Sequence, residues 1–224
     1  MVSSADTRPA RDCFLTIASL ARIHGALGHV AEGLGSAYRA LSLARRTGSI
    51  SLRVYALILL GERQLDLHHL DVARLAFEQA LRGSQRAESE YLTQLATIGL
   101  IETCVAGGEP GAALDLARRS DGFERPTPAL AEACALAYVA NDGVADALKW
   151  VDVAATSGDT LRQAWVRAWI DLARGQLSLA ERRCSDAVER FQGDHPTRDA
   201  LALWTTRGAI AEKGEDRALA ASCR

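Results

Sequence analysis

The sequence contains neither a long apolar run nor a cluster of basic residues. A bilayer-spanning helix needs roughly 18 to 20 apolar residues, whereas the most apolar segment, 52–60, includes Arg53 and is soon followed by Glu62. Basic residues occur singly or in pairs such as Arg45-Arg46, and the formal net charge is -2. A chain with this balance has no bulk attraction for phosphate. These absences predict a protein that binds neither a membrane nor nucleic acid directly.

The N-terminus also lacks the continuous apolar segment of a secretory signal. Cysteine is scarce, and its odd number and wide spacing argue against both a disulfide framework and a zinc site. The five cysteines are Cys13, Cys104, Cys134, Cys184 and Cys223. Only Lys149 and Lys213 are lysines among the 26 basic residues, a bias toward arginine that is typical of a GC-rich bacterial genome. We therefore expect a bacterial, cytoplasmic protein with reduced thiols inside its helices.

Patterns that would carry chemistry are missing as well. His68 and His69 are adjacent and cannot both face one metal ion from a regular helix, and His24 and His29 have no nearby carboxylate or cysteine partner. The glycine-rich segment 107–111 has no strand before it, so it does not predict a nucleotide-binding loop. No nucleophile elbow or other catalytic signature is present. The sequence thus predicts no enzyme activity, and no catalytic, cofactor-binding or metal-binding residues.

What the sequence does contain is a repeated spacing of small residues. In segment 60–81, Gly61 is followed at +12, +16 and +19 by Ala73, Phe77 and Ala80. The same template fits segments whose first members are Ala21, Ile101, Ala135 and Ala168. Two antiparallel helices joined by a short turn approach closely only where the facing side chains are small. The template therefore predicts pairs of helices, with Gly61 facing Ala73.

Helix start and stop signals agree with this division. Three starts are predicted, at Thr127 with Pro128, at Thr160 with Gln163 and at Ser178 with Glu181. Breaks are predicted at Gly28, Gly48, Gly108, Gly143 and Gly175, because glycine adopts turn conformations at least cost. Apolar residues recur at three and four positions, and alternating strand patterns are absent. These signals together predict an all-α chain.

The arrangement resembles the tetratricopeptide repeat, whose unit has a Leu-Gly pair in its first helix and Ala, aromatic, Ala on its second. Segment 60–81 matches best, and Ile101 departs from the pattern because a small residue is usual there. The resemblance implies a right-handed α-solenoid of five to six stacked antiparallel helix pairs. The expected units are 14–47, 54–87, 94–121, 128–156, 161–191 and a partial 197–222, in one domain, 11–222, after a flexible segment, 1–10.

In that family the first helices of the units line a concave groove that receives a ligand. Carried over through the template, the groove residues are Arg22, Glu62, Glu102, Glu132, Leu136, Trp165, Trp169 and Trp204. Trp165 and Trp169 are four residues apart and share a helix face. The resemblance therefore predicts an aromatic patch, with an acidic stretch of glutamates leading to it. Two alternatives stay open: the tryptophans belong to the core, or the glutamates are ordinary solvated charges.

The expected function is to bind a protein or peptide, without a cofactor. The 40-residue spacing of the +12 members at 33, 73 and 113 is similar to helical repeats of bacterial transcription activators and peptide-sensing regulators. A regulatory or adaptor role is expected on that resemblance. The alternatives are a self-associating homo-oligomer and the sensor segment of a larger regulator.

Overall fold

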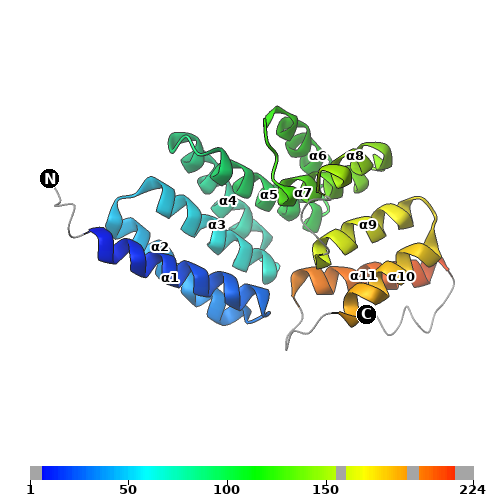
Figure 1. Cartoon of the computed structure of the whole chain (residues 1–224), viewed down its shortest axis with the longest axis horizontal. Coiled ribbons are helices and arrows are strands. Elements are labelled where there is room, and N and C mark those ends of the chain that lie inside the picture. The colour runs from blue at the N-terminus through cyan, green and yellow to red at the C-terminus, as the bar shows by residue number, and fades with distance from the viewer. Residues whose placement is uncertain (1–6, 155–159, 191–196, 215–224) are drawn as a thin grey trace. The chain divides into compact units, whose positions relative to one another are not determined.

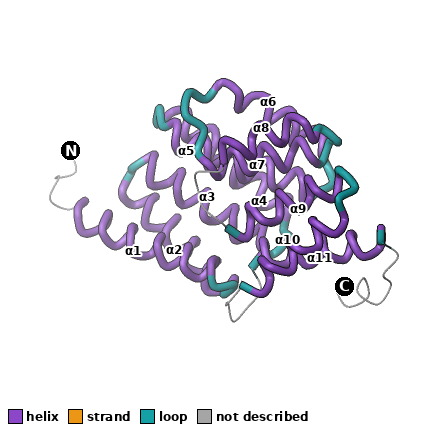
Figure 2. Tube along the Cα trace, turned by 45° about the vertical axis from the view of Figure 1, so that its right-hand side comes forward, coloured by secondary structure: helices purple, strands orange, loops and turns teal. Residues whose placement is uncertain are grey.

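The computed structural model describes residues 7–154, 160–190 and 197–214. Within these residues the chain forms eleven α-helices, one short 3₁₀ helix and no strand. Figure 2 shows helices joined by loops and turns. The prediction of an all-α chain is confirmed. Residues 1–6 of the expected N-terminal segment, and those after 214 in the expected last unit, lie outside this description. Helix α1 already begins at Thr7.

The helices belong to two compact units, Met1–Gly107 and Gly108–Arg224. Unit 1 contains α1 (Thr7–Ala26), α2 (Val30–Thr47), α3 (Ile50–Asp66), α4 (Leu70–Arg86) and α5 (Glu90–Ala106). Unit 2 contains α6 (Pro110–Arg119), the 3₁₀ helix η1 (Ser120–Gly122), α7 (Pro128–Val139), α8 (Val144–Ala154), α9 (Leu161–Ala173), α10 (Leu177–Glu189) and α11 (Arg198–Lys213). Figure 1 labels the α-helices in chain order. Helices α5 and α6, expected to form the third pair, fall in different units.

The turns from first to second helix share one geometry. Their left-handed residues include Gly28, His68, Asp142 and Gly175, with φ of 76°, 58°, 59° and 73°. In each turn, the residue that follows the left-handed one donates its N–H to a carbonyl five residues earlier in the chain, at 2.8 to 2.9 Å. This is the Schellman arrangement that closes a helix. Gly143 lies in its predicted turn, but the left-handed position is taken by Asp142, a residue type that tolerates this conformation.

Two of the three predicted helix starts are confirmed. The hydroxyl of Thr127 accepts the N–H of Leu130 at 3.3 Å, and that of Thr160 accepts the N–H of Gln163 at 3.0 Å. The third is wrong, because α10 begins at Leu177 with Gln176 as its N-cap. The turn at Gly175 fixes that start two residues earlier than predicted, so Ser178 lies inside the first turn of the helix.

In the core of unit 1, the ring of Phe77 packs between two glycines. A Cβ built on Gly61 would lie 2.7 Å from Cε1 of Phe77, and one built on Gly99 only 2.2 Å from it. Gly61 and Ala73 are both buried, as predicted. Their mutual contact stays a prediction, and the atoms nearest the missing Cβ of Gly61 belong to Phe77 on α4. The aromatic residue of the template thus fills the space that the glycines leave.

Helices α9, α10 and α11 share a core in unit 2. It is formed by Ala168, Leu172, Ala180, Cys184, Ala187, Leu203 and Ile210. Cys104 and Cys134 are also buried, whereas Cys13 is exposed. Burial raises the pKa of the Cys134 thiol to about 12. That thiol is therefore protonated at neutral pH and packs as a small apolar group.

Candidate functional site

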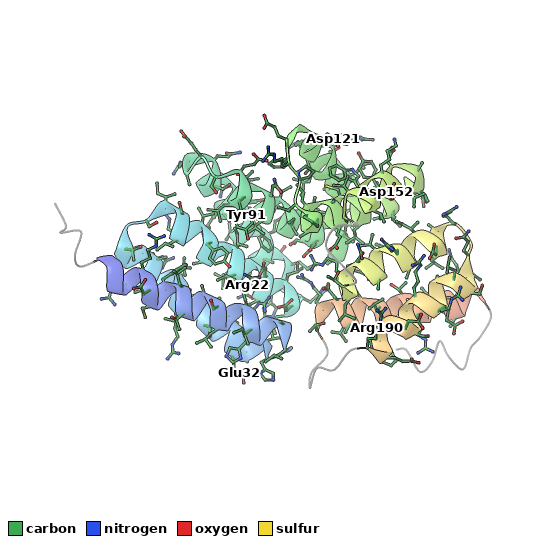
Figure 3. The ribbon with its side chains drawn as sticks, in the orientation of Figure 1. Arg22, Glu32, Tyr91, Asp121, Asp152 and Arg190 are labelled. Atoms are coloured by element: carbon green, nitrogen blue, oxygen red, sulfur yellow. The ribbon has the colours of Figure 1, made fainter. Side chains whose placement is uncertain are left out.

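The first helices of unit 1 are α1, α3 and α5, and each contacts the next. They bring together Arg22 from α1, Tyr55 and Glu62 from α3, and Tyr91 from α5. We call these four residues the tyrosine–arginine surface. Figure 3 labels Arg22 and Tyr91 on their helices. The sequence predicted two members of this set, Arg22 and Glu62.

Electrostatic coupling shows that the four residues lie close to one another. Tyr55 raises the pKa of Arg22, with smaller contributions from Glu62 and Tyr91. Burial raises the pKa of Tyr55, and Arg22 opposes that shift through its charge and a side-chain hydrogen bond. The Tyr55 ring also packs 6.4 Å from the Phe14 ring, at a tilt of 59°. Tyr55 is therefore held in place, while Tyr91 is 56% exposed.

Tyr55 and Tyr91 were missed because the template reaches only one turn from each small residue. A signal for them does exist in the sequence. Tyr55 precedes Glu62 by seven residues and Tyr91 precedes Glu102 by eleven, and both spacings return to the same face of an α-helix. Extending the predicted groove face toward the helix N-termini would have found both tyrosines.

The predicted carboxylates differ in exposure. The Glu62 side chain is 35% exposed and lies 3.6 Å from the guanidinium of Arg63, which also contacts Asp66 at 3.2 Å. Glu102 is only 9% exposed and Glu132 only 5%. Of the three, Glu62 alone presents a substantial part of its side chain to solvent. The three carboxylates therefore do not form a shared acidic surface on the described helices.

Leu136 is likewise interior, at 2% exposure. The cause is the composition of its helix, because α7 is buried continuously from Leu130 to Ala137. A helix that is apolar all round is enclosed by its neighbours and has no free face. Leu136 therefore contributes to the core of unit 2, and a partner cannot reach its side chain without displacing other residues.

Trp165, Trp169 and Trp204 lie on the later first helices of unit 2, α9 and α11, whereas Trp150 lies on α8. The rings of Trp165 and Trp169 stack at 6.0 Å with an interplanar angle of 14°, so their shared face is confirmed. Both are partly buried against the α9–α11 core. The Trp165 indole N–H donates to the Thr206 hydroxyl of α11 at 3.1 Å. Trp165 therefore has an internal role in joining α9 to α11, and only its ring is left for a partner.

Trp204 is 37% exposed on α11. It lies two residues before Thr206, and residues with that separation point to different sides of a helix. Trp165 contacts the side of α11 that carries Thr206. Trp204 points to a different side of that helix and therefore does not extend the stacked pair. Leu201, three residues earlier and 50% exposed, shares the face of Trp204.

His68 and His69 lie in the turn between α3 and α4, as predicted. His68 is an exposed left-handed residue, and Nδ1 of His69 lies 2.9 Å from Oε1 of Gln64. Among the described residues no three His, Cys, Asp or Glu side chains gather as metal ligands would. No helix in the described part of the chain is both long and apolar enough to span a membrane.

A solved structure similar to this chain is that of a tetratricopeptide repeat protein from Parabacteroides merdae ATCC 43184. The two are 15% identical with a TM-score of 0.51, over 94% of this chain and 77% of that chain. At this identity the likeness shows the fold, which is a tetratricopeptide-like arrangement of sequential antiparallel helix pairs. No protein-family model matches the sequence. No curated protein matches it.

Proposed function

We propose that this chain is a protein-binding repeat module whose tyrosine–arginine surface receives a segment of a partner protein. One observation carries the proposal: Arg22, Tyr55 and Tyr91 come from three successive first helices and lie close enough for both tyrosines to raise the pKa of Arg22. Tyrosine and arginine are enriched among the residues that contribute most to interface affinity. The held Tyr55 and the exposed Tyr91 give a partner both a fixed and an accessible aromatic side chain.

The chemistry of the surface defines the partner segment. Arg22 is exposed and carries a full positive charge, whereas the charge of Glu62 is partly neutralised by Arg63. A guanidinium beside two phenols suits a carboxylate, which accepts hydrogen bonds from all three. The tyrosine rings suit an apolar or aromatic neighbour. The expected segment therefore combines an acidic residue with a large apolar one.

The test compares two tyrosines of similar exposure. Peptides are selected by display against the intact chain, and their Kd values are measured by fluorescence anisotropy. Tyr91→Ala should weaken binding by about tenfold or more, because it removes an interface aromatic. Tyr38→Ala is the matched control, since Tyr38 is 51% exposed on α2, a second helix. Equal affinities for the two variants would refute the proposed surface.

The tryptophan pair of unit 2 is proposed as a second contact surface. Its support is the partial exposure of the stacked rings of Trp165 and Trp169. Because Trp165 also joins α9 to α11, its contribution to binding must be separated from stability by measuring helix content alongside affinity. We also propose a regulatory or adaptor role in the bacterial cytoplasm, supported by the spacing and composition of the sequence.

Self-association is the second candidate function, and a specific observation favours it. Leu20 and Ile23 on α1, and Leu27 in the turn directly after it, follow one side at 43%, 52% and 43% exposure. An exposed apolar stripe of this kind can pair with a second copy of itself. If it does, light scattering will give a dimer mass that Ile23→Glu returns to the monomer. A monomer at every concentration tested would eliminate this candidate.

A further inference from the structure

A pocket of about 290 Å³ opens in unit 1 among α2, α3 and α4. Four arginines line it, Arg45 from α2, Arg53 from α3, and Arg82 and Arg86 from α4. Its apolar lining includes Leu41, Val54 and Leu57. No carboxylate is among the residues that line this pocket. The pocket therefore concentrates positive charge over an apolar floor.

Helix stability explains only part of this arginine cluster. Arg45 and Arg86 are in the last turns of α2 and α4, where the helix dipole favours a cation. Arg53, however, is in the first turns of α3, where the dipole disfavours one. Like charges gathered in one pocket also repel one another. Neither effect favours Arg53 at this position in the absence of an anion.

Neighbouring residues offer little compensation. Arg82 has an ion pair with Glu78 at 3.8 Å, but both side chains are well exposed, at 60% and 45%. Exposed pairs of this kind contribute little. Within the described residues, neither Arg45, Arg53 nor Arg86 forms an ion pair. The guanidinium groups are consequently available to an external ligand.

We propose that this pocket binds a phosphoryl group. Guanidinium groups bind phosphate through paired hydrogen bonds, and a dianion with three acceptor oxygens can engage several arginines at once. A single carboxylate would leave most of the positive charge uncompensated. The volume is at the lower limit for small-molecule sites, so it suits one phosphate ester group rather than a large ligand. The apolar floor accommodates the carbon atoms next to that group.

The pocket goes beyond the proposed protein-binding function. Two of its three helices, α2 and α4, are second helices, and it includes none of the four residues of the tyrosine–arginine surface. The phosphoryl group could belong to a phosphorylated side chain of a partner or to a free phosphate ester. The recognition chemistry is the same for both, and the experiment distinguishes them.

The first arm uses inorganic phosphate and the intact chain. Thermal unfolding is followed by circular dichroism in phosphate and in chloride at equal ionic strength. At ten times the Kd, phosphate should raise Tm by roughly 3 to 5 °C. Arg45→Gln should lose most of this increase, and Arg45→Gln combined with Arg86→Gln should lose all of it. Arg46→Gln is the matched control, because Arg46 is exposed in the same last turn of α2 but does not line the pocket.

An equal Tm increase in all variants would identify a general salt effect and overturn the proposal, as would no increase in the wild type. Arg53→Gln provides an independent check on folding. In chloride it should keep or raise Tm, because it removes a cation from the start of α3, and in phosphate it should lose the increase. A variant that stays folded yet retains the full phosphate response would place the anion elsewhere.

The second arm identifies the source of the phosphoryl group by calorimetry. A peptide with one phosphoserine is compared with glycerol phosphate and with the same peptide bearing glutamate. Binding of the phosphopeptide at least tenfold tighter than glycerol phosphate assigns a phosphorylated partner, whereas equal affinities assign a small phosphate ester. Equal binding of the glutamate peptide would overturn recognition of a phosphoryl group.

Discussion

Phe77 is the residue whose size determines the packing of unit 1. Its ring is completely buried and occupies the space that side chains on Gly61 and Gly99 would need. These three residues come from α4, α3 and α5, so one ring holds three successive helices at a fixed separation. The two glycines are required here for space rather than for an unusual backbone conformation, since both lie inside helices.

Gly99→Ala should therefore destabilise the protein. Its Cβ would lie 2.2 Å from the Phe77 ring, and the buried ring has no free volume into which to move. We expect a loss of about 1 to 3 kcal/mol in the free energy of unfolding, measured by urea denaturation. Gly35→Ala is the control, because nothing lies within 4 Å of its missing Cβ. It should gain about 0.5 to 1 kcal/mol from helix propensity. Equal stabilities of the two variants would contradict the position of the ring.

The sequence predicted the burial of small residues correctly, but it did not predict which carboxylates are exposed. A small residue at helical spacing implies a close contact whatever surrounds it, and this is why Gly61 and Ala73 were correctly expected to be buried. Whether a glutamate is exposed depends on how many neighbours enclose its helix. Helix α5 is buried continuously from Ala96 to Cys104, and this encloses Glu102. A template of spacings within one repeat does not contain that information.

At the scale of the element, the helix boundaries follow two kinds of local signal. A threonine N-cap such as Thr127 acts within its own turn, so the sequence alone located the start of α7. The start of α10 depends instead on the left-handed residue Gly175 and the closing bond from Gln176 to the Asp171 carbonyl. Where a tight turn and a capping pattern compete, the turn geometry sets the boundary. Ser178 was therefore assigned a role that its position prevents.

This difference can be measured with two alanine substitutions. Thr127→Ala should lower the free energy of unfolding by about 1 kcal/mol, because the Leu130 N–H loses its acceptor. Ser178→Ala should be neutral or slightly stabilising, since alanine has the higher helix propensity and Gln176 remains the N-cap. Chemical denaturation of both variants provides the values. A loss at Ser178 as large as that at Thr127 would restore the capping role predicted from the sequence.

At the scale of the whole molecule, each unit has its own core. In unit 1 the core is organised around Phe77, and in unit 2 the helices α9, α10 and α11 enclose Leu203 and the small residues around it. Helical repeat proteins are stabilised mainly by contacts between neighbouring elements, so a local change need not spread along the chain. The two cores are therefore expected to lose stability separately.

Hydrogen exchange of the intact chain tests this separation. Gly99→Ala should lower the amide protection of α3, α4 and α5, because they share the Phe77 contact, and should leave α9 to α11 unchanged. Leu203→Ala should do the reverse, because this completely buried residue belongs to the core of unit 2. The two variants are controls for each other. If either one lowers protection evenly across all helices, the chain unfolds as one cooperative body, and the nearest-neighbour account of its stability fails.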